Sequence, residues 1–103
     1  IDVQGARDIR RAYPEAIAIF IVPQSRDELE RRLRARGLDN EESIRKRLIN
    51  ADRELQEASG FQYVIVNEEL DSATRELESV VRATRITHAR QKARLARVFR
   101  DFR

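Results

Sequence analysis

Basic side chains gather in one stretch of this sequence, RRLRARGLDNEESIRKRL, which runs from Arg31 to Leu48. Arg32 and Arg36 are four residues apart, so a helix places both on one face. Arg47 directly precedes the apolar Leu48 and therefore lies at the edge of an apolar stripe. A guanidinium group in that position needs an anion, and its planar donors fit phosphate or carboxylate. The spacing indicates a phosphate clamp made by Arg32, Arg36 and Arg47.

The same spacing also fits a charged helical hairpin that binds no ligand. Glu28 lies four residues before Arg32, and Glu42 lies four residues before Lys46, so each acid can pair with its base along a helix. Exposed pairs of this kind are common and contribute little stability. Spacing alone favours this hairpin over the clamp and leaves both interpretations open.

The composition is that of a folded α/β unit or part of one. Charged residues make up 38% of the 103 residues and hydrophobic residues 41%, which is typical of a helix-rich globular chain and not of a disordered one. The net charge of +3 is concentrated near the end, where residues 90–103 hold six basic residues and one acid. The chain has no cysteine and a single histidine, so we expect no disulfide, no thiolate metal site and no imidazole cluster.

No segment of the sequence has the length of a membrane span. The longest apolar run, residues 16–22, is far shorter than the roughly 20 residues that a bilayer requires. No charged and then apolar leader precedes it. We therefore expect no membrane association and a cytoplasmic location. Because the chain opens at Ile1 and Asp2 with what reads as the end of a strand, we also expect it to be a piece of something longer.

The first half of the sequence alternates between strand and helix patterns. Pro14 and Pro23 interrupt these patterns, and Ser25 with Glu28 forms a capping box that starts a helix whose Leu29 and Leu33 face inward. The elements expected here are the end of a strand at residues 1–3, a turn at residues 4–6, a helix over residues 6–13, and a strand over residues 16–22 that is buried on both faces.

The second half continues the alternation. Asp39 and Glu42 predict the start of a longer helix that ends at Gly60, with an apolar seam formed by Ile44, Leu48, Ala51, Leu55 and Ala58. A short strand over residues 63–66 then ends on Asn67. Asp71 is expected to cap a last helix that carries Leu77, Val80 and Val81 inward and extends toward the carboxyl end, with a kink or break over residues 84–88.

These elements predict an α/β fold with a parallel sheet and crossover helices. Ligands of such sheets bind outside the carboxyl ends of the strands, where the pattern places Asp2, residues 23–25 and Asn67. We expect one partial domain, with core units at residues 1–30, an arginine-rich helical lid at residues 31–48, further core at residues 49–88 and a basic C-terminal helix at residues 89–103.

Several motifs together resemble the carboxyl-terminal half of guanylate kinase. They are the opening IDVQGA, the strand and turn from Ile21 to Ser25, the lid RRLRARG followed by EESIRKRL, and the strand VIVNEELDSA. The tail RATRITHARQKARLARVF is similar to the basic extension of proteobacterial members. The resemblance covers essentially the whole chain.

This resemblance implies a P-loop kinase fold and transfer of the γ-phosphoryl group of ATP to GMP, with Mg²⁺ bridging phosphates. By motif, Arg32, Arg36 and Arg47 would contact the phosphates as the lid closes. Asn67 would meet the adenine side of ATP, and Asp2 would lie on the GMP side. Positioned cations suit this reaction, because charge spreads over the phosphoryl oxygens in the transition state.

One family motif is absent from these 103 residues. The phosphate-binding loop Gly-x-x-x-x-Gly-Lys-Ser/Thr does not occur, and we expect it, together with the guanine-binding segment, to lie before Ile1. We therefore expect the parent enzyme to be active and this chain alone to be inactive. GMP-dependent consumption of ATP by the chain alone would contradict this expectation.

Two other functions stay open. A guanylate-kinase-like module that binds proteins without catalysis is one, although such modules tend to lose the lid arginines that this chain keeps. The other is a nucleic-acid-binding helix near the end of the chain, where a basic stripe lies beside apolar residues: Arg90, Arg94, Arg97, Leu95, Val98, Phe99 and Phe102. No base-reading motif accompanies that stripe, so we favour self-association through this helix or through an exposed sheet edge.

Overall fold

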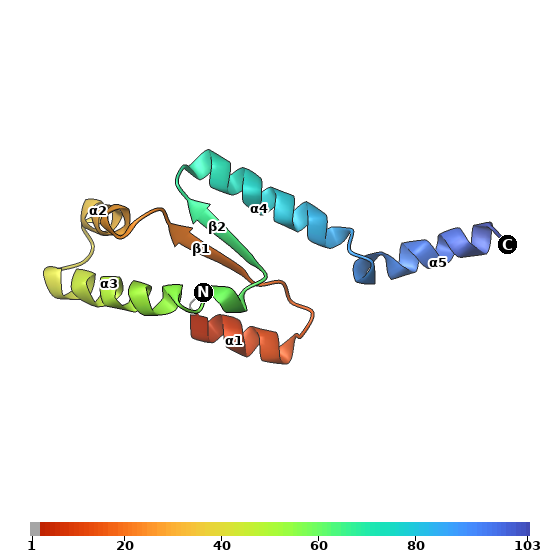
Figure 1. Ribbon diagram of the computed structural model, residues 1–103, viewed down its shortest axis with the longest axis horizontal. Helices are drawn as coiled ribbons and strands as arrows, with labels where there is room; N and C mark the ends of the chain where they lie inside the picture. The colour runs from red at the N-terminus through yellow and green to blue at the C-terminus, as the bar shows by residue number, and fades with distance from the viewer. Residues whose placement is uncertain (1–2) are drawn as a thin grey trace.

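The computed structural model describes residues 3–103, which form a two-stranded parallel sheet surrounded by helices (Figure 1). Two short 3₁₀ turns, η1 and η2, complete the set. In chain order the elements are α1 (Val3–Ala12), β1 (Ile19–Pro23), α2 (Arg26–Arg36), α3 (Glu41–Leu55), η1 (Ala58–Gly60), β2 (Tyr63–Asn67), α4 (Leu70–Arg85), η2 (Ala89–Gln91) and α5 (Lys92–Asp101).

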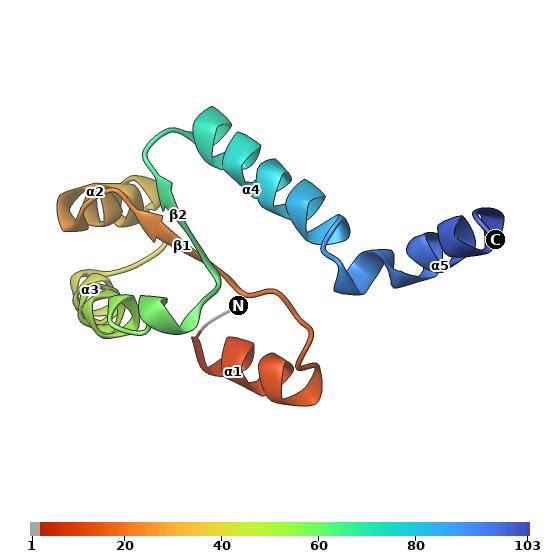
Figure 2. The same ribbon diagram turned by 45° about the vertical axis from the view of Figure 1, so that its right-hand side comes forward.

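The two strands are parallel, as the sequence predicts, and their register brings the carboxyl ends to one edge. Ile19 pairs with Tyr63 at the start, and Pro23 pairs with Asn67 at the end. The connection from β1 to β2 runs through α2 and α3, while α4 follows β2 and lies on the opposite side of the sheet from α1 and α3 (Figures 1 and 2). The predicted α/β class with crossover helices is confirmed.

The core is divided between the helical hairpin and the sheet. Leu33, Ile44 and Leu48 form a buried cluster between α2 and α3, and Leu29 packs against it, as the apolar spacing predicts. In the sheet, Ile65 is 2% exposed and Val22 is 9% exposed, but Ile21 is 56% exposed. The prediction that the first strand is buried on both faces is therefore wrong for the described residues, because the helices cover only part of this two-stranded sheet.

The starts of the two hairpin helices differ in how well the sequence predicts them. Ser25 caps α2, since its Oγ accepts a hydrogen bond from the Glu28 backbone N–H at 3.0 Å, which confirms the predicted start. The cap of α3 is Asn40, whose side chain accepts from the Ser43 backbone N–H at 2.9 Å. The predicted start at Asp39 is therefore wrong by one residue, since an Asn side chain caps as well as an Asp.

The amino-terminal segment is helical where a strand end and a turn were expected. The helix α1 begins at Val3 and includes residues 4–6, so those two predictions are wrong, while Ile1 and Asp2 lie outside the described residues. Two arginines dock this helix beside η1: Arg7 pairs with Glu57, and Arg10 donates to the Gly60 carbonyl oxygen. Their spacing of three residues fits one helix face, and this explains why helix prevails here.

Three boundaries later in the chain also need correction or confirmation. The helix α3 ends at Leu55, before Gly60, and Ala58–Gly60 is a separate 3₁₀ turn. The N-cap of α4 is Glu69, not Asp71. The predicted break is confirmed, because α4 ends at Arg85 and α5 begins at Lys92.

The helix α5 extends away from the sheet and gives the molecule a long axis of 67 Å (Figure 1). It is tied back through Arg90 in η2, whose Nη2 donates to the Glu15 carbonyl oxygen at 2.9 Å. None of the helices described in residues 3–103 combines the length and the apolar content needed to cross a bilayer.

Candidate functional site

The predicted arginines lie on a hairpin made by α2 and α3, which turns at Gly37. This glycine has a φ of 67°, the left-handed conformation that favours glycine, and its backbone N–H donates to the Arg34 carbonyl oxygen. The turn stops α2 immediately after Arg36 and lets α3 run back beside it. The predicted lid over residues 31–48 is thus a helical hairpin, although residues 31 and 48 lie within helices and mark no boundary in the backbone.

Arg36 and Arg47 meet at one carboxylate. The Nη2 group of Arg36 donates to Oδ2 of Asp39 at 2.8 Å, and the Nε group of Arg47 lies 3.9 Å from the same oxygen. Arg36 ends α2, whereas Arg47 projects from the middle of α3. The hairpin therefore brings together two of the three guanidinium groups in the clamp hypothesis.

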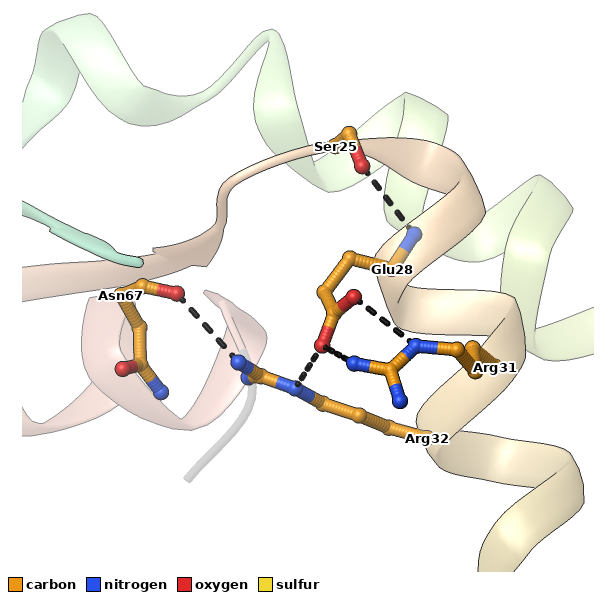
Figure 3. Close-up of polar contacts among 5 residues, drawn as sticks. All are labelled: Ser25, Glu28, Arg31, Arg32 and Asn67. Carbon is orange, nitrogen blue, oxygen red and sulfur yellow. Dashed lines mark hydrogen bonds and ion pairs between the residues drawn. The ribbon is translucent and has the colours of Figure 1, made fainter. Parts of the chain in front are cut away.

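Arg32 points instead toward the ends of the strands. Its Nε donates to the Glu28 carboxylate at 3.1 Å, and its Nη2 donates to the Asn67 backbone carbonyl oxygen at 3.5 Å (Figure 3). Arg31 also donates to this carboxylate, to both of its oxygens. The hydrogen bonds from Arg31 and Arg32 lower the pKa of the Glu28 carboxyl below its ordinary value, so this acid stays ionised and holds Arg32 in place.

Asn67 has an unusual environment at the end of β2. Its side-chain Oδ1 is buried and has no hydrogen-bond partner among the described residues. An unpaired buried acceptor costs free energy, and a native structure generally retains one for a reason. Asn67 is thus a better ligand-binding candidate than an ordinary turn residue.

The predicted site residues form two pairs. Arg32 lies beside Asn67, and Arg36 lies beside Arg47, with no contact between the pairs in the part of the chain that the structure describes. Asp2 falls outside the described residues, so its predicted position is not tested. Arg47 also lines a hollow of about 420 Å³ between α2 and α3, together with Leu29, Leu33, Asn50, Ala51 and Glu54.

The charged-hairpin interpretation also finds its contacts. Arg32 pairs with Glu28 at 3.1 Å and Lys46 pairs with Glu42 at 3.5 Å. On another face of α2, Arg34 pairs with Glu41 and also with Glu30 at 3.1 Å. The hydrogen bonds that Arg34 donates to Glu41 and Glu30 raise the pKa of Arg34 above its ordinary value. The pairs that the charged-hairpin interpretation requires are therefore present, and this interpretation stays open beside the clamp hypothesis.

Sequence reasoning missed that Asp39 contacts both Arg36 and Arg47. The available signal was its position three residues after Arg36 across a glycine turn, but we interpreted that acid as a helix cap. Among residues 3–103, no three acidic or histidine side chains are grouped as a metal site would require.

Comparison with known proteins places these observations in a family. Residues 1–84 match the family model for guanylate kinase. Over 100 residues the chain is 47% identical to guanylate kinase from Chromobacterium violaceum, covering 97% of this chain and 48% of the relative. It is 47% identical over 94 residues to that of Escherichia coli K12, covering 91% and 45%. The chain spans about half the length of these curated relatives.

A solved structure gives the same result. The crystal structure of guanylate kinase from Anaplasma phagocytophilum superposes with a TM-score of 0.70 at 31% identity, covering 87% of this chain and 42% of that one. The chain belongs to the guanylate kinase family.

Proposed function

We propose that the protein carrying this chain transfers the γ-phosphoryl group of ATP to GMP, giving ADP and GDP. The family match supports this activity. Within this chain, the structural observation that supports it is the contact between Arg32 and Asn67. A cation from the hairpin there meets the carboxyl end of a parallel strand. That edge is where α/β sheets bind ligands.

The arginines have a clear task in this reaction. Phosphoryl transfer spreads negative charge over the phosphate oxygens, and positioned cations stabilise that charge. We assign this task to Arg32, Arg36 and Arg47, with Asn67 on the ATP side and Asp2 on the GMP side. Because Arg32 is apart from Arg36 and Arg47 here, productive binding requires the hairpin to bend toward the strand ends.

Mg²⁺ would accompany ATP in this proposal. The described residues gather no set of acids that could form a metal cage, so they do not fit a metal site built from protein ligands alone. Phosphate oxygens are the common ligands of Mg²⁺ in enzymes of this kind. We derive no step through the metal from this chain.

A coupled assay of ADP formation by the full-length protein tests the proposed activity. With ATP as donor, we expect turnover with GMP and much slower turnover with AMP, CMP or UMP. Turnover without an acceptor, or a preference for AMP, would contradict the assignment. In the same assay we expect the 103-residue chain alone to be inactive.

A cytoplasmic location of the full-length protein stays a prediction.

A further inference from the structure

Asp39 lies at the turn of the hairpin without capping a helix. The cap of α3 is the next residue, Asn40, so the usual reason for an acid before a helix does not apply to Asp39. Its side chain is only 16% exposed, although it carries a charge. A carboxylate that is largely covered in this way needs cationic partners.

Those partners are two arginines from different helices. The Asp39 Oδ2 atom accepts from Nη2 of Arg36 at 2.8 Å and faces Nε of Arg47 at 3.9 Å. Two guanidinium groups this close to one point would repel each other without an anion between them. The single carboxylate oxygen offsets that repulsion and fixes the end of α2 relative to the middle of α3.

The contacts leave most of the arginine donors available. A guanidinium group has five N–H donors, and Asp39 accepts a hydrogen bond from only one of those on Arg36. For Arg47 it faces the Nε side and leaves the outer nitrogens uncovered. Within residues 3–103, no other acid or carbonyl oxygen accepts from either group. Both arginines can therefore keep their contact with Asp39 while they bind a second anion.

We propose that Asp39 is a positioning residue, which gathers Arg36 and Arg47 into one phosphate-binding unit. This inference rests on the proposed kinase function, in which those two arginines contact the transferring phosphate. Asp39 itself contacts no substrate. Its effect on the reaction passes entirely through the two guanidinium groups, and this separates it from an acid that merely stabilises the hairpin.

The first test is Asp39→Asn in the full-length protein. This change keeps the shape of the side chain and leaves the Asn40 cap intact. We expect kcat to fall about tenfold, since misplaced catalytic groups lose rate, while KM for GMP stays unchanged. Asp39→Glu, which keeps the charge, should recover part of the rate. The matched control is Glu42→Gln, which removes one acid from the same hairpin and frees only Lys46; its kcat should equal that of the wild type.

The second test separates positioning from stability. In an Arg36→Gln/Arg47→Gln background, Asp39→Asn should change kcat less than twofold, because there is nothing left to position. If it still lowers kcat tenfold there, Asp39 acts through the fold and the inference is wrong. If Asp39→Asn lowers the thermal unfolding temperature, the effect of this change on kcat in the two backgrounds still distinguishes positioning of the arginines from a general loss of stability.

Failure of this inference is distinct from failure of the proposed function. If Arg36→Gln/Arg47→Gln itself keeps wild-type activity, the assignment of those arginines to phosphate is wrong. If that variant loses activity and Asp39→Asn does not, the kinase proposal stands and only the role of Asp39 is overturned.

Discussion

The Nη2 group of Arg32 lies 3.5 Å from the backbone carbonyl oxygen of Asn67, which is 35 residues further along the chain. This distance is at the long end for a hydrogen bond, so the contact is weak. The Nε group of the same arginine binds Glu28 at 3.1 Å. The Nε group of Arg32 is thus firmly bound to Glu28, whereas its Nη2 group makes only a weak contact with Asn67. An anionic phosphate would be a stronger partner for Nη2 than the carbonyl oxygen.

The first prediction concerns Arg32. In the full-length protein, Arg32→Gln should lower kcat/KM by about 100-fold, because an electrostatic donor to the transferring phosphate is lost. The control is the adjacent Arg31→Gln. Arg31 binds the same carboxylate, but its side chain is 73% exposed, and it makes no contact with β2 among the described residues. Equal losses for the two variants would show that only the pairing with Glu28 matters.

The second prediction concerns Asn67. Because its buried Oδ1 has no partner among residues 3–103, Asn67→Ala removes an unsatisfied acceptor and should leave the free energy of unfolding unchanged or slightly higher. The same change should raise KM for ATP about tenfold and leave KM for GMP unchanged. Chemical denaturation and steady-state kinetics measure the two effects. A less stable protein with an unchanged KM for ATP would identify Asn67 as a structural residue.

Periodicity and capping signals were sufficient for the central part of the fold. Leu29 and Leu33 predict the inward face of α2, Ser25 predicts its start, and the apolar run around Ile65 predicts β2. These signals are local, since each depends on residues within one or two helical turns. They would be expected to survive in any tertiary context.

The errors arose where a local signal had two possible outcomes. Residues 3–6 form a helix because Arg7 and Arg10 dock α1 beside η1, more than 45 residues away, a contact that no local pattern reveals. Asp39 and Asn40 are both good caps, and the sequence alone does not decide between them. The separation of Arg32 from Arg36 and Arg47 depends on how α2 and α3 cross, so it too required the structure.

The third prediction is a pH dependence that arises from Glu28. The hydrogen bonds from Arg31 and Arg32 lower the pKa of this carboxyl below 4.5 in the folded protein, so the unfolded chain binds the proton more readily. The resulting stabilisation is fully present above pH 4.5 and is lost as the pH falls through the lowered pKa. The stability difference between the wild type and Glu28→Gln should therefore shrink in acid. A difference that is the same near neutral pH and well below pH 4.5 would contradict this prediction.

The fourth prediction concerns self-association through α5. Two aromatic residues near the end of this helix are unusually accessible: Phe99 is 58% exposed and Phe102, the C-cap residue, is 84% exposed. An apolar stripe on a helix that projects from the body gains from burial against a second copy. Sedimentation of the full-length protein should show a concentration-dependent species heavier than the monomer, and Phe99→Gln/Phe102→Gln should remove it.

The basic face of the same helix supports the alternative to self-association, which is binding to nucleic acid. If α5 instead serves to bind nucleic acid through Arg94 and Arg97, a generic RNA should bind with an affinity that falls steeply as salt is added. Phe99→Gln would leave that affinity unchanged, whereas Arg94→Gln/Arg97→Gln would reduce it. Because the two variants remove different faces of one helix, measuring both association and RNA binding for each separates an apolar dimer contact from an electrostatic one.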